Sequence, residues 1–320
     1  MTKKTKIWLI IAASFVLVGC IIFTGVMSVL KWDFRKLSTV KYQTNLYEIT
    51  EVFEDISIKT DTADIIFVVS DDAKCKVECY EEEKAKHSVT VQENTLAINI
   101  VNQKSWHDYI GINIGSPKIM IYLPKTEYTS LVIKTSTGDI EIPKDFEFQN
   151  VDISLSTGDV DFYASASELI KIKASTGDIS LENMSAGSLD LSVSTGEITV
   201  KGVNCEGDLR VNVSTGKAYL TDVNCNSVLS SGSTGDINLK NVIAKEKFSI
   251  KRSTGDVKFN GCDAGEIFVE TDTGDVTGSL LSEKVFVTKT STGKIDVPNT
   301  VTGGKCEIKT DTGDIKITLK

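Results

Sequence analysis

A four-residue motif, Ser-Thr-Gly-Asp or a close variant, recurs ten times in this chain and constrains its fold more than any other feature. The first copy is Ser136-Thr137-Gly138-Asp139 and the last is Asp311-Thr312-Gly313-Asp314. A fixed period of about 20 residues is typical of a solenoid, in which each repeat buries its apolar face only against neighbouring repeats. The ten glycines lie 19 or 20 residues apart, at Gly138, Gly158, Gly177, Gly196, Gly216, Gly235, Gly255, Gly274, Gly293 and Gly313.

Apolar and polar residues alternate on both sides of each motif. In the repeat around Gly255, Phe248 and Ile250 precede the glycine, and Val257 and Phe259 follow it with the same spacing of two. This spacing indicates β-strands with one buried face, and glycine permits the sharp corner between them. Residues 131–320 therefore predict an all-β fold, a single-stranded parallel β-solenoid (β-helix) with about 19–20 residues per turn.

Residues 49–130 are predicted to form irregular N-terminal coils and a cap. Asp61-Thr62-Ala63-Asp64 is a degenerate copy of the motif, with alanine in place of glycine. Ala63 lies 75 residues before Gly138 (138 − 63), which is close to four periods. The spacing predicts a solenoid that starts near residue 50, with atypical first coils because an end coil meets solvent or a cap.

An aromatic cluster lies in this irregular region. Residues 103–116 interrupt the alternation and contain Trp106, His107 and Tyr109. We expect this inserted loop to pack over one end of the solenoid. A loop that faces a ligand is the alternative interpretation.

The N-terminus has the composition of a membrane segment. Residues 7–30 contain no charged residue, and three lysines precede them within residues 1–6. About 20 apolar residues span a bilayer as a helix, so we expect a transmembrane helix over 7–30, a cytoplasmic tail over 1–6 and a linker over 31–48. Basic residues flank both ends of the run and do not decide its orientation. A β-rich body behind a leading anchor is usually exported, so we expect a single-pass protein with an extracellular body.

Cys20 offers a second interpretation of the same segment. Leu17-Val18-Gly19-Cys20 resembles a lipobox, which would make Cys20 an acylated N-terminus after cleavage. However, ten further uncharged and mostly apolar residues follow Cys20, where a lipoprotein normally becomes polar. The sequence favours the uncleaved helix, and both interpretations attach the chain to a membrane.

The net charge of −9 argues against nucleic acid as a partner. The seven cysteines and two histidines show no zinc-binding spacing. Cys205 and Cys225 occupy equivalent positions in adjacent repeats. Two stacked coils are close enough for a disulfide, but stacked side chains point the same way, so a bridge between them is the less favoured alternative.

Charged residues follow the corner glycines and form a predicted row along the solenoid. A calcium-binding edge is one interpretation, because oxygen ligands suit a hard cation. The favoured interpretation is structural, with each aspartate accepting local backbone N–H groups. Eight of the ten repeats offer a carboxylate at this position and two offer lysine, so no catalytic, cofactor-binding or metal-binding residue is singled out, and we expect no enzymatic activity. The residues are Asp139, Asp159, Asp178, Glu197, Lys217, Asp236, Asp256, Asp275, Lys294 and Asp314.

The C-terminal residues continue the strand pattern to the end of the chain. Ile315, Ile317 and Leu319 are apolar and two apart. An uncapped last coil would leave an open strand edge, which can pair with another chain. We therefore expect weak end-to-end self-association through the last coil.

The chain resembles the bacterial putative-adhesin family, which includes LiaG-like membrane-anchored envelope proteins. The resemblance rests on residues 58–65 (IKTDTADI), residues 121–124 (IYLP) and the repeated Ser-Thr-Gly-Asp-Ile units behind an N-terminal anchor. It implies a β-solenoid on a bacterial surface and offers no catalytic residues. We expect a non-enzymatic surface protein that contacts cell-wall polymer, a host surface or a membrane-protein partner. Accessory roles in envelope-stress sensing, and less so a carbohydrate-active β-helix enzyme, are the alternatives.

Overall fold

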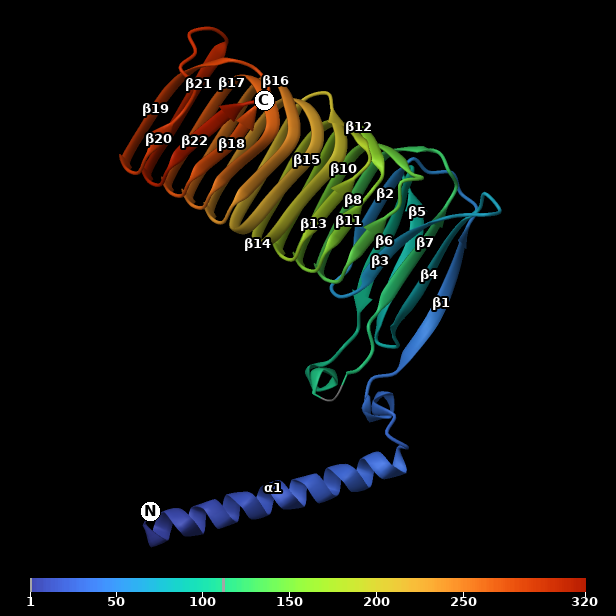
Figure 1. Ribbon diagram of the computed structural model, residues 1–320. Coiled ribbons are helices and arrows are strands. Elements are labelled where there is room, and N and C mark those ends of the chain that lie inside the picture. The colour runs from blue at the N-terminus through green and yellow to red at the C-terminus, as the bar shows by residue number, and fades with distance from the viewer. Residues whose placement is uncertain (1, 111–112) are drawn as a thin grey trace.

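The structure, a computed structural model, describes residues 2–110 and 113–320. One long helix, α1 (Lys3–Val29), is followed by the short 3-10 helix η1 (Phe34–Leu37) and then by strands that wind into one solenoid (Figure 1). A second short helix, η2 (Trp106–Tyr109), interrupts the strands. The strands are β1 (Tyr42–Ile49), β2 (Asp55–Lys59), β3 (Asp64–Val69), β4 (Cys75–Glu82), β5 (Ala85–Gln92), β6 (Thr95–Asn102), β7 (Lys118–Leu123), β8 (Glu127–Thr137), β9 (Ile140–Ile142), β10 (Glu147–Thr157), β11 (Val160–Phe162), β12 (Ser165–Thr176), β13 (Ile179–Glu182), β14 (Ser185–Cys205), β15 (Asp208–Thr234), β16 (Ile237–Thr254), β17 (Val257–Thr273), β18 (Val276–Leu280), β19 (Lys284–Thr292), β20 (Ile295–Asp296), β21 (Gly304–Thr312) and β22 (Ile315–Leu319).

The repeats stack as parallel coils around one apolar core, which confirms the predicted parallel β-solenoid. Leu131, Val151, Ile170 and Leu189 lie in register on β8, β10, β12 and β14, and none is more than 2% exposed. Burial of each large aliphatic side chain contributes roughly 1.5–3 kcal/mol before the entropy of ordering the chain is subtracted. A single repeat has no second layer to cover this face, so the coils fold only as a stack.

Each corner requires glycine for two independent reasons. The ten corner glycines have φ between +125° and +159°, a region that residues with a side chain rarely adopt. A Cβ atom at Gly158 would also lie 2.2 Å from the carbonyl oxygen of Gly138 in the preceding coil. The predicted Thr-Gly corner is therefore fixed by backbone conformation and by close contact between coils.

The order of the coils differs from the order of the sequence at the N-terminal end. The coil β2–β3 lies between the coil β6–β7 and the coil β8–β9. Ala63 is therefore adjacent to Gly138, and its N–H donates to Thr137 O at 3.0 Å. The interpretation of the 75-residue gap as four stacked periods is wrong, because the intervening chain leaves the stack and forms its outer end.

Antiparallel strands close this end of the solenoid. β4 runs antiparallel to β7, β5 runs antiparallel to β6, and β1 pairs antiparallel with the other edge of β4. β1 occupies residues that we expected to be linker, so the segment between α1 and the body is shorter than residues 31–48. The cap formed by β1, β4 and β5 lies at the end of the body that is nearest to α1 in Figure 1.

At the C-terminal end, too, the spatial order of the coils differs from their order in the sequence. The last coil, β21–β22, lies between β17–β18 and the penultimate coil, β19–β20. The prediction that the last residues form the open end is therefore wrong, because Ile315 is fully buried inside the stack. The open edge belongs to β19 and β20, where Val287 and Ile295 are 48% and 46% exposed.

Helix α1 is the one helix among residues 2–110 and 113–320 that is long and apolar enough to cross a membrane. It extends away from the solenoid, and Met27 is its single buried residue (Figure 1). Its place near the N-terminus also fits a signal sequence.

Candidate functional site

The corner carboxylates bind the backbone of the next coil. Asp139 Oδ1 accepts the N–H of Asp159 at 2.9 Å, and Asp159 Oδ1 accepts the N–H of Asp178 at 2.8 Å. The same bond links Asp236 to Asp256 at 3.0 Å. The structural interpretation of the carboxylate row thus fits this geometry, with the difference that the N–H group belongs to the neighbouring coil and not to the same turn.

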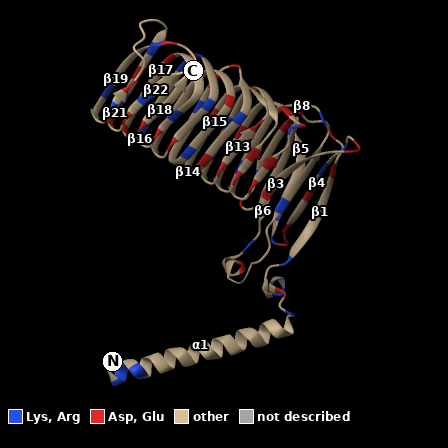
Figure 2. Cartoon of the chain, viewed as in Figure 1, with Lys and Arg blue, Asp and Glu red and all other residues tan. Residues whose placement is uncertain are grey.

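The last position of the row is a lysine, which cannot accept a backbone N–H group. The N–H of Lys294 donates to Asp314 Oδ1 at 2.8 Å, and the coil of Lys294 is the terminal one, with no further coil to hold. In the middle of the row, Lys217 Nζ lies 3.9 Å from Asp236 Oδ2. The backbone N–H of Asp275 and then Lys258 hold the pKa of Asp256 below its ordinary value. The row is a set of structural acceptors along one edge of the solenoid, where Figure 2 shows acidic residues at successive corners.

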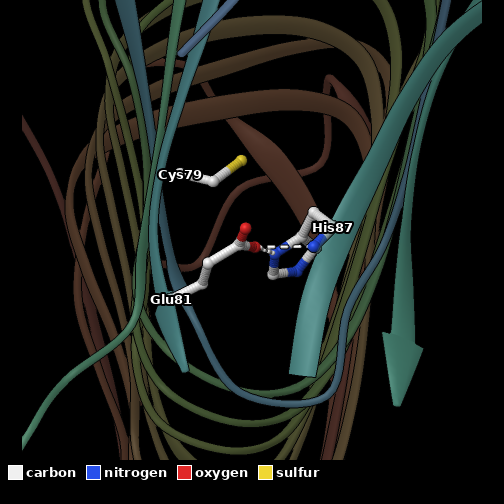
Figure 3. Close-up of side chains that lie close together, drawn as sticks. All are labelled: Cys79, Glu81 and His87. Carbon is white, nitrogen blue, oxygen red and sulfur yellow. Dashed lines mark hydrogen bonds and ion pairs between the residues drawn. The ribbon is translucent and has the colours of Figure 1, made fainter. Parts of the chain in front are cut away.

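The cap encloses a buried polar cluster that the repeats did not predict. His87 on β5 is 3% exposed, and its Nδ1 and backbone N both lie 2.6 Å from Glu81 Oε2 (Figure 3). His87 Nε2 lies 2.8 Å from the hydroxyl oxygen of Thr60, and Asn45 Nδ2 donates to Glu81 Oε1 at 2.5 Å. Cys79 and Glu81 lie two residues apart on β4, so both side chains are on the face of the strand that points into the cap. This alternation is the signal from which the sequence could have placed Glu81 inside.

The donor atoms of this cluster are already engaged. One group of His, Cys, Asp or Glu side chains among the described residues has possible metal-ligand atoms within 4.8 Å of one another. It consists of Cys79, Glu81 and His87. Both oxygens of Glu81 accept hydrogen bonds, and burial raises the pKa of the Cys79 thiol to about 12. Thr60, His87 and Glu81 follow the order of a nucleophile, a base and an acid, but they are 6%, 3% and 1% exposed. The arrangement is that of a satisfied polar core, which holds the cap on the first coils.

A cleft of about 270 Å³ lies beside His87, between the first corner and the chain that joins β6 to β7. Polar side chains tie this joining loop to the cap. Lys104 Nζ lies 2.5 Å from Glu82 Oε2, and Asn113 Nδ2 donates to Glu82 Oε1 at 3.1 Å. The hydroxyl of Tyr42 donates to Asn113 Oδ1 at 2.8 Å, and Lys84 pairs with Asp108. The loop is therefore fixed to the cap on its polar side.

The aromatic side chains of this loop are largely exposed, although the hydroxyl of Tyr109 accepts a hydrogen bond from Asn102 Nδ2 at 3.1 Å and Lys104 Nζ lies 5.4 Å from the centre of its ring. Trp106 is 71% exposed and Tyr109 is 65% exposed, and His107 beside them is also exposed. The expectation that these residues pack over the solenoid end is wrong, because the cap strands already cover that end. Figure 1 shows the loop projecting from the body at the end where α1 leaves it.

A comparison with protein families identifies the one to which these repeats belong. The family model described as Toastrack DUF4097 matches residues 53–212 and 204–320. The chain belongs to this family. The resemblance inferred from the repeated motif is thereby confirmed for the family and the fold.

Among the solved structures that the chain resembles are proteins from Bacteroides and Parabacteroides species. A putative adhesin from Bacteroides fragilis has 17% identity and a TM-score of 0.44, and the match covers 87% of this chain and 97% of that one. A putative lipid binding protein from Parabacteroides distasonis has 18% identity and a TM-score of 0.48, over 75% of this chain and 98% of that one. A putative adhesin from Parabacteroides merdae has 13% identity and a TM-score of 0.48, over 77% and 98%. No curated protein matches the chain.

The thiols of this Toastrack chain are free. Cys205 and Cys225 lie on adjacent coils without a disulfide, and both are 3% exposed. Burial raises the pKa of Cys205 to about 11 and that of Cys225 to about 12. Neither cysteine therefore reacts readily as a thiolate.

One buried arginine breaks the apolar pattern. Arg252 is 3% exposed and donates to the hydroxyl of Ser230 at 2.9 Å, while its Nε has no partner among the described residues. A Cβ at Gly232 would lie 1.7 Å from Arg252 Nη1, so the arginine fills the space that the glycine leaves. Burial lowers the pKa of Arg252 to about 10. Arg252 and Gly232 therefore pack against each other inside the stack.

Proposed function

We propose that this Toastrack protein is anchored in a cell membrane by α1 and presents its solenoid outside the cell as a non-enzymatic binding scaffold. The observation that carries the proposal is the exposure of the apolar side chains of α1. Trp8, Phe15 and Leu17 are 71%, 75% and 61% exposed, because the helix packs against no other part of the body. An apolar surface of this extent is stable when lipid covers it.

The continuity of α1 supports an uncleaved anchor. The helix runs from Lys3 through Cys20 to Val29 without a break, and its apolar side chains continue on both sides of Cys20. This length suits a bilayer span better than the shorter apolar region of a cleaved signal. The solenoid then begins directly after a short segment, on the outer side of the membrane.

The scaffold role is supported by how the polar groups of the solenoid are used. The corner carboxylates hold neighbouring coils, and the polar atoms of Thr60, His87 and Glu81 are engaged with one another, with each residue at most 6% exposed. On the outer strands, opposite charges on adjacent coils pair with each other, such as Lys251 with Glu270 at 2.8 Å. Figure 2 shows charges of both signs over the coils. A surface of this kind suits a partner recognised by repeated hydrogen bonds, such as cell-wall polymer, a host surface or another membrane protein.

Membrane extraction and binding assays test the proposal. The full chain should stay in the membrane pellet after alkaline carbonate washing, whereas a variant with several α1 leucines and isoleucines changed to serine should be released. Binding of the membrane-bound protein to purified wall polymer or host glycans would support an adhesin. Specific co-purification of a membrane sensor would support the alternative role in envelope-stress signalling. Release of the unmodified chain by carbonate, or cleavage of a wall polysaccharide, would contradict the proposal.

A further inference from the structure

We infer that the loop between β6 and β7 makes a second contact with the membrane. Trp106, Tyr109, Ile110 and Ile114 lie in the headgroup region of the same bilayer that holds α1. The inference rests on the proposed anchoring by α1 and adds an orientation of the body relative to the lipid surface.

In an ordinary surface loop the polar side chains face solvent, whereas in this loop several of them face the protein. Its polar side chains face the protein, where Lys104 pairs with Glu82 and Asn113 bonds to both Glu82 and Tyr42. Its large apolar and aromatic side chains are exposed instead, and among them Tyr109 is also bonded to Asn102 through its hydroxyl. Trp106, Tyr109, Ile110 and Ile114 are 71%, 65%, 70% and 41% exposed. Exposed clusters of this kind mark a surface that another phase or partner covers.

The chain connection keeps this loop close to the bilayer. Tyr42 lies 12 residues after Leu30 (42 − 30), at the end of α1. A fully extended segment of this length spans at most about 42 Å, and η1 shortens it further. The linker and the loop also line one cleft of about 370 Å³, which includes Lys41, Lys84 and Ile110. The N–H of Glu83 donates to Lys41 O at 3.0 Å, so the cap is fixed directly beside the segment that leaves the membrane.

The chemistry of this end suits lipid headgroups. Trp and Tyr are enriched at membrane interfaces, where the ring lies in the apolar region and the polar group stays hydrated. Basic side chains accompany them, and these attract the phosphate groups of lipids. They are Lys31, Lys36 and Lys41, all in the segment between α1 and β1. A lipid surface is therefore the occupant that the position of the anchor favours over a separate protein.

Tryptophan quenching tests the contact in the full chain. The sequence has three tryptophans, Trp8, Trp32 and Trp106, so double Trp→Phe variants leave one reporter each. The variants are reconstituted into vesicles of phosphatidylcholine and phosphatidylglycerol, with lipids brominated near the headgroup or at mid-chain. Trp106 should be quenched about twofold more strongly by the shallow bromines than by the deep ones, as for an interfacial side chain. Trp8 in the anchor reports on the proposed span.

Two matched substitutions in the Trp106 reporter complete the test. Ile110→Asp should abolish most of the shallow quenching, whereas Val301→Asp, at an 86% exposed position at the other end of the body, should leave it unchanged. Quenching of Trp8 without quenching of Trp106 would overturn the loop contact and leave the anchor intact. Absence of Trp8 quenching would overturn the anchor and, with it, the inference. Trp106 quenching that Ile110→Asp does not reduce would also overturn the loop contact.

Discussion

At the scale of single residues, the corner glycines carry the strictest requirement in the chain. Gly158 has φ +135°, and a Cβ there would lie 2.2 Å from the backbone oxygen of Gly138. Gly158→Ala should lower the free energy of unfolding by about 3 kcal/mol, because it adds backbone strain and separates two coils. Chemical denaturation of the detergent-solubilised chain measures this change.

The neighbouring corner position provides the control for this prediction. Ser156 is exposed in the same motif, so Ser156→Ala should change stability by less than about 0.5 kcal/mol. Equal effects of the two substitutions would show that the corner tolerates a side chain and that the close approach of coils is absent.

The corner aspartates should stabilise the stack in a pH-dependent manner. Asp256 Oδ1 accepts the N–H of Asp275 at 3.0 Å, and Asp256→Ala should cost about 1 kcal/mol at neutral pH. Lys294→Ala on the terminal coil should cost close to nothing, because no further coil follows it. The folded-state pKa of Asp256 is lowered, chiefly by this N–H group. The carboxylate therefore stabilises the fold above its unfolded pKa, and this contribution is lost as pH falls through the lower folded pKa.

Chemical denaturation at several pH values tests this pH dependence of stability. The stability difference between the natural chain and Asp256→Ala should be largest above about pH 5 and should shrink below about pH 4, where the unfolded carboxylate binds its proton. A difference that stays constant down to strong acid would indicate that charge has no part in the bond.

At the scale of elements, the coils could be predicted from the sequence but their order could not. Residues two apart around each glycine predict strands, and their register follows because a slip would expose apolar side chains. The same property makes coils interchangeable, since Val276 pairs with Ile315 as well as it would with Ile295. Lys294 lies on the terminal coil, but Lys217 has the same corner position in the middle of the stack, so a lysine there does not identify the last coil.

The contacts within the cap could not be predicted from the sequence, although alternation along β4 could have placed Glu81 on the buried face. His87 and Glu81 lie six residues apart and meet only because β4 and β5 turn back on each other. Arg252 departs from the pattern at a position where the other repeats have Thr, Val, Leu, Ala or Gly, and its space depends on Gly232 at the same position one coil away. Local periodicity contains no information on either contact, since both depend on tertiary packing.

Disulfide trapping tests the inverted order at the C-terminal end. In-register residues on adjacent strands lie about 4.8 Å apart, within the Cα separation of a disulfide, so a strong oxidant can bridge them even though their side chains point the same way. Residues two coils apart lie beyond that separation. Thr277→Cys with Lys316→Cys should therefore oxidise to a disulfide, as should Lys316→Cys with Asp296→Cys. Thr277→Cys with Asp296→Cys should not. Bridging of this third pair alone would show that the coils follow the sequence order.

At the scale of the whole molecule, the two ends of the solenoid differ in how they are closed. The N-terminal end is closed by antiparallel strands and faces the proposed membrane contact. The C-terminal end exposes the edge of β19 and β20. Weak end-to-end association stays a prediction, now placed on this edge, and it would join two copies tail to tail. Lys289 and Pro298 near the edge should keep such pairing weak.

Labelling of intact cells tests the central claim most directly, namely that an anchored solenoid stands outside the membrane. The six cysteines of the body are buried, so they leave a quiet background for a membrane-impermeant maleimide. A cysteine in place of Val301, 86% exposed, should be labelled on intact cells, and a cysteine in place of Lys4 only after permeabilisation. Labelling of the Val301→Cys chain only after permeabilisation would contradict the account.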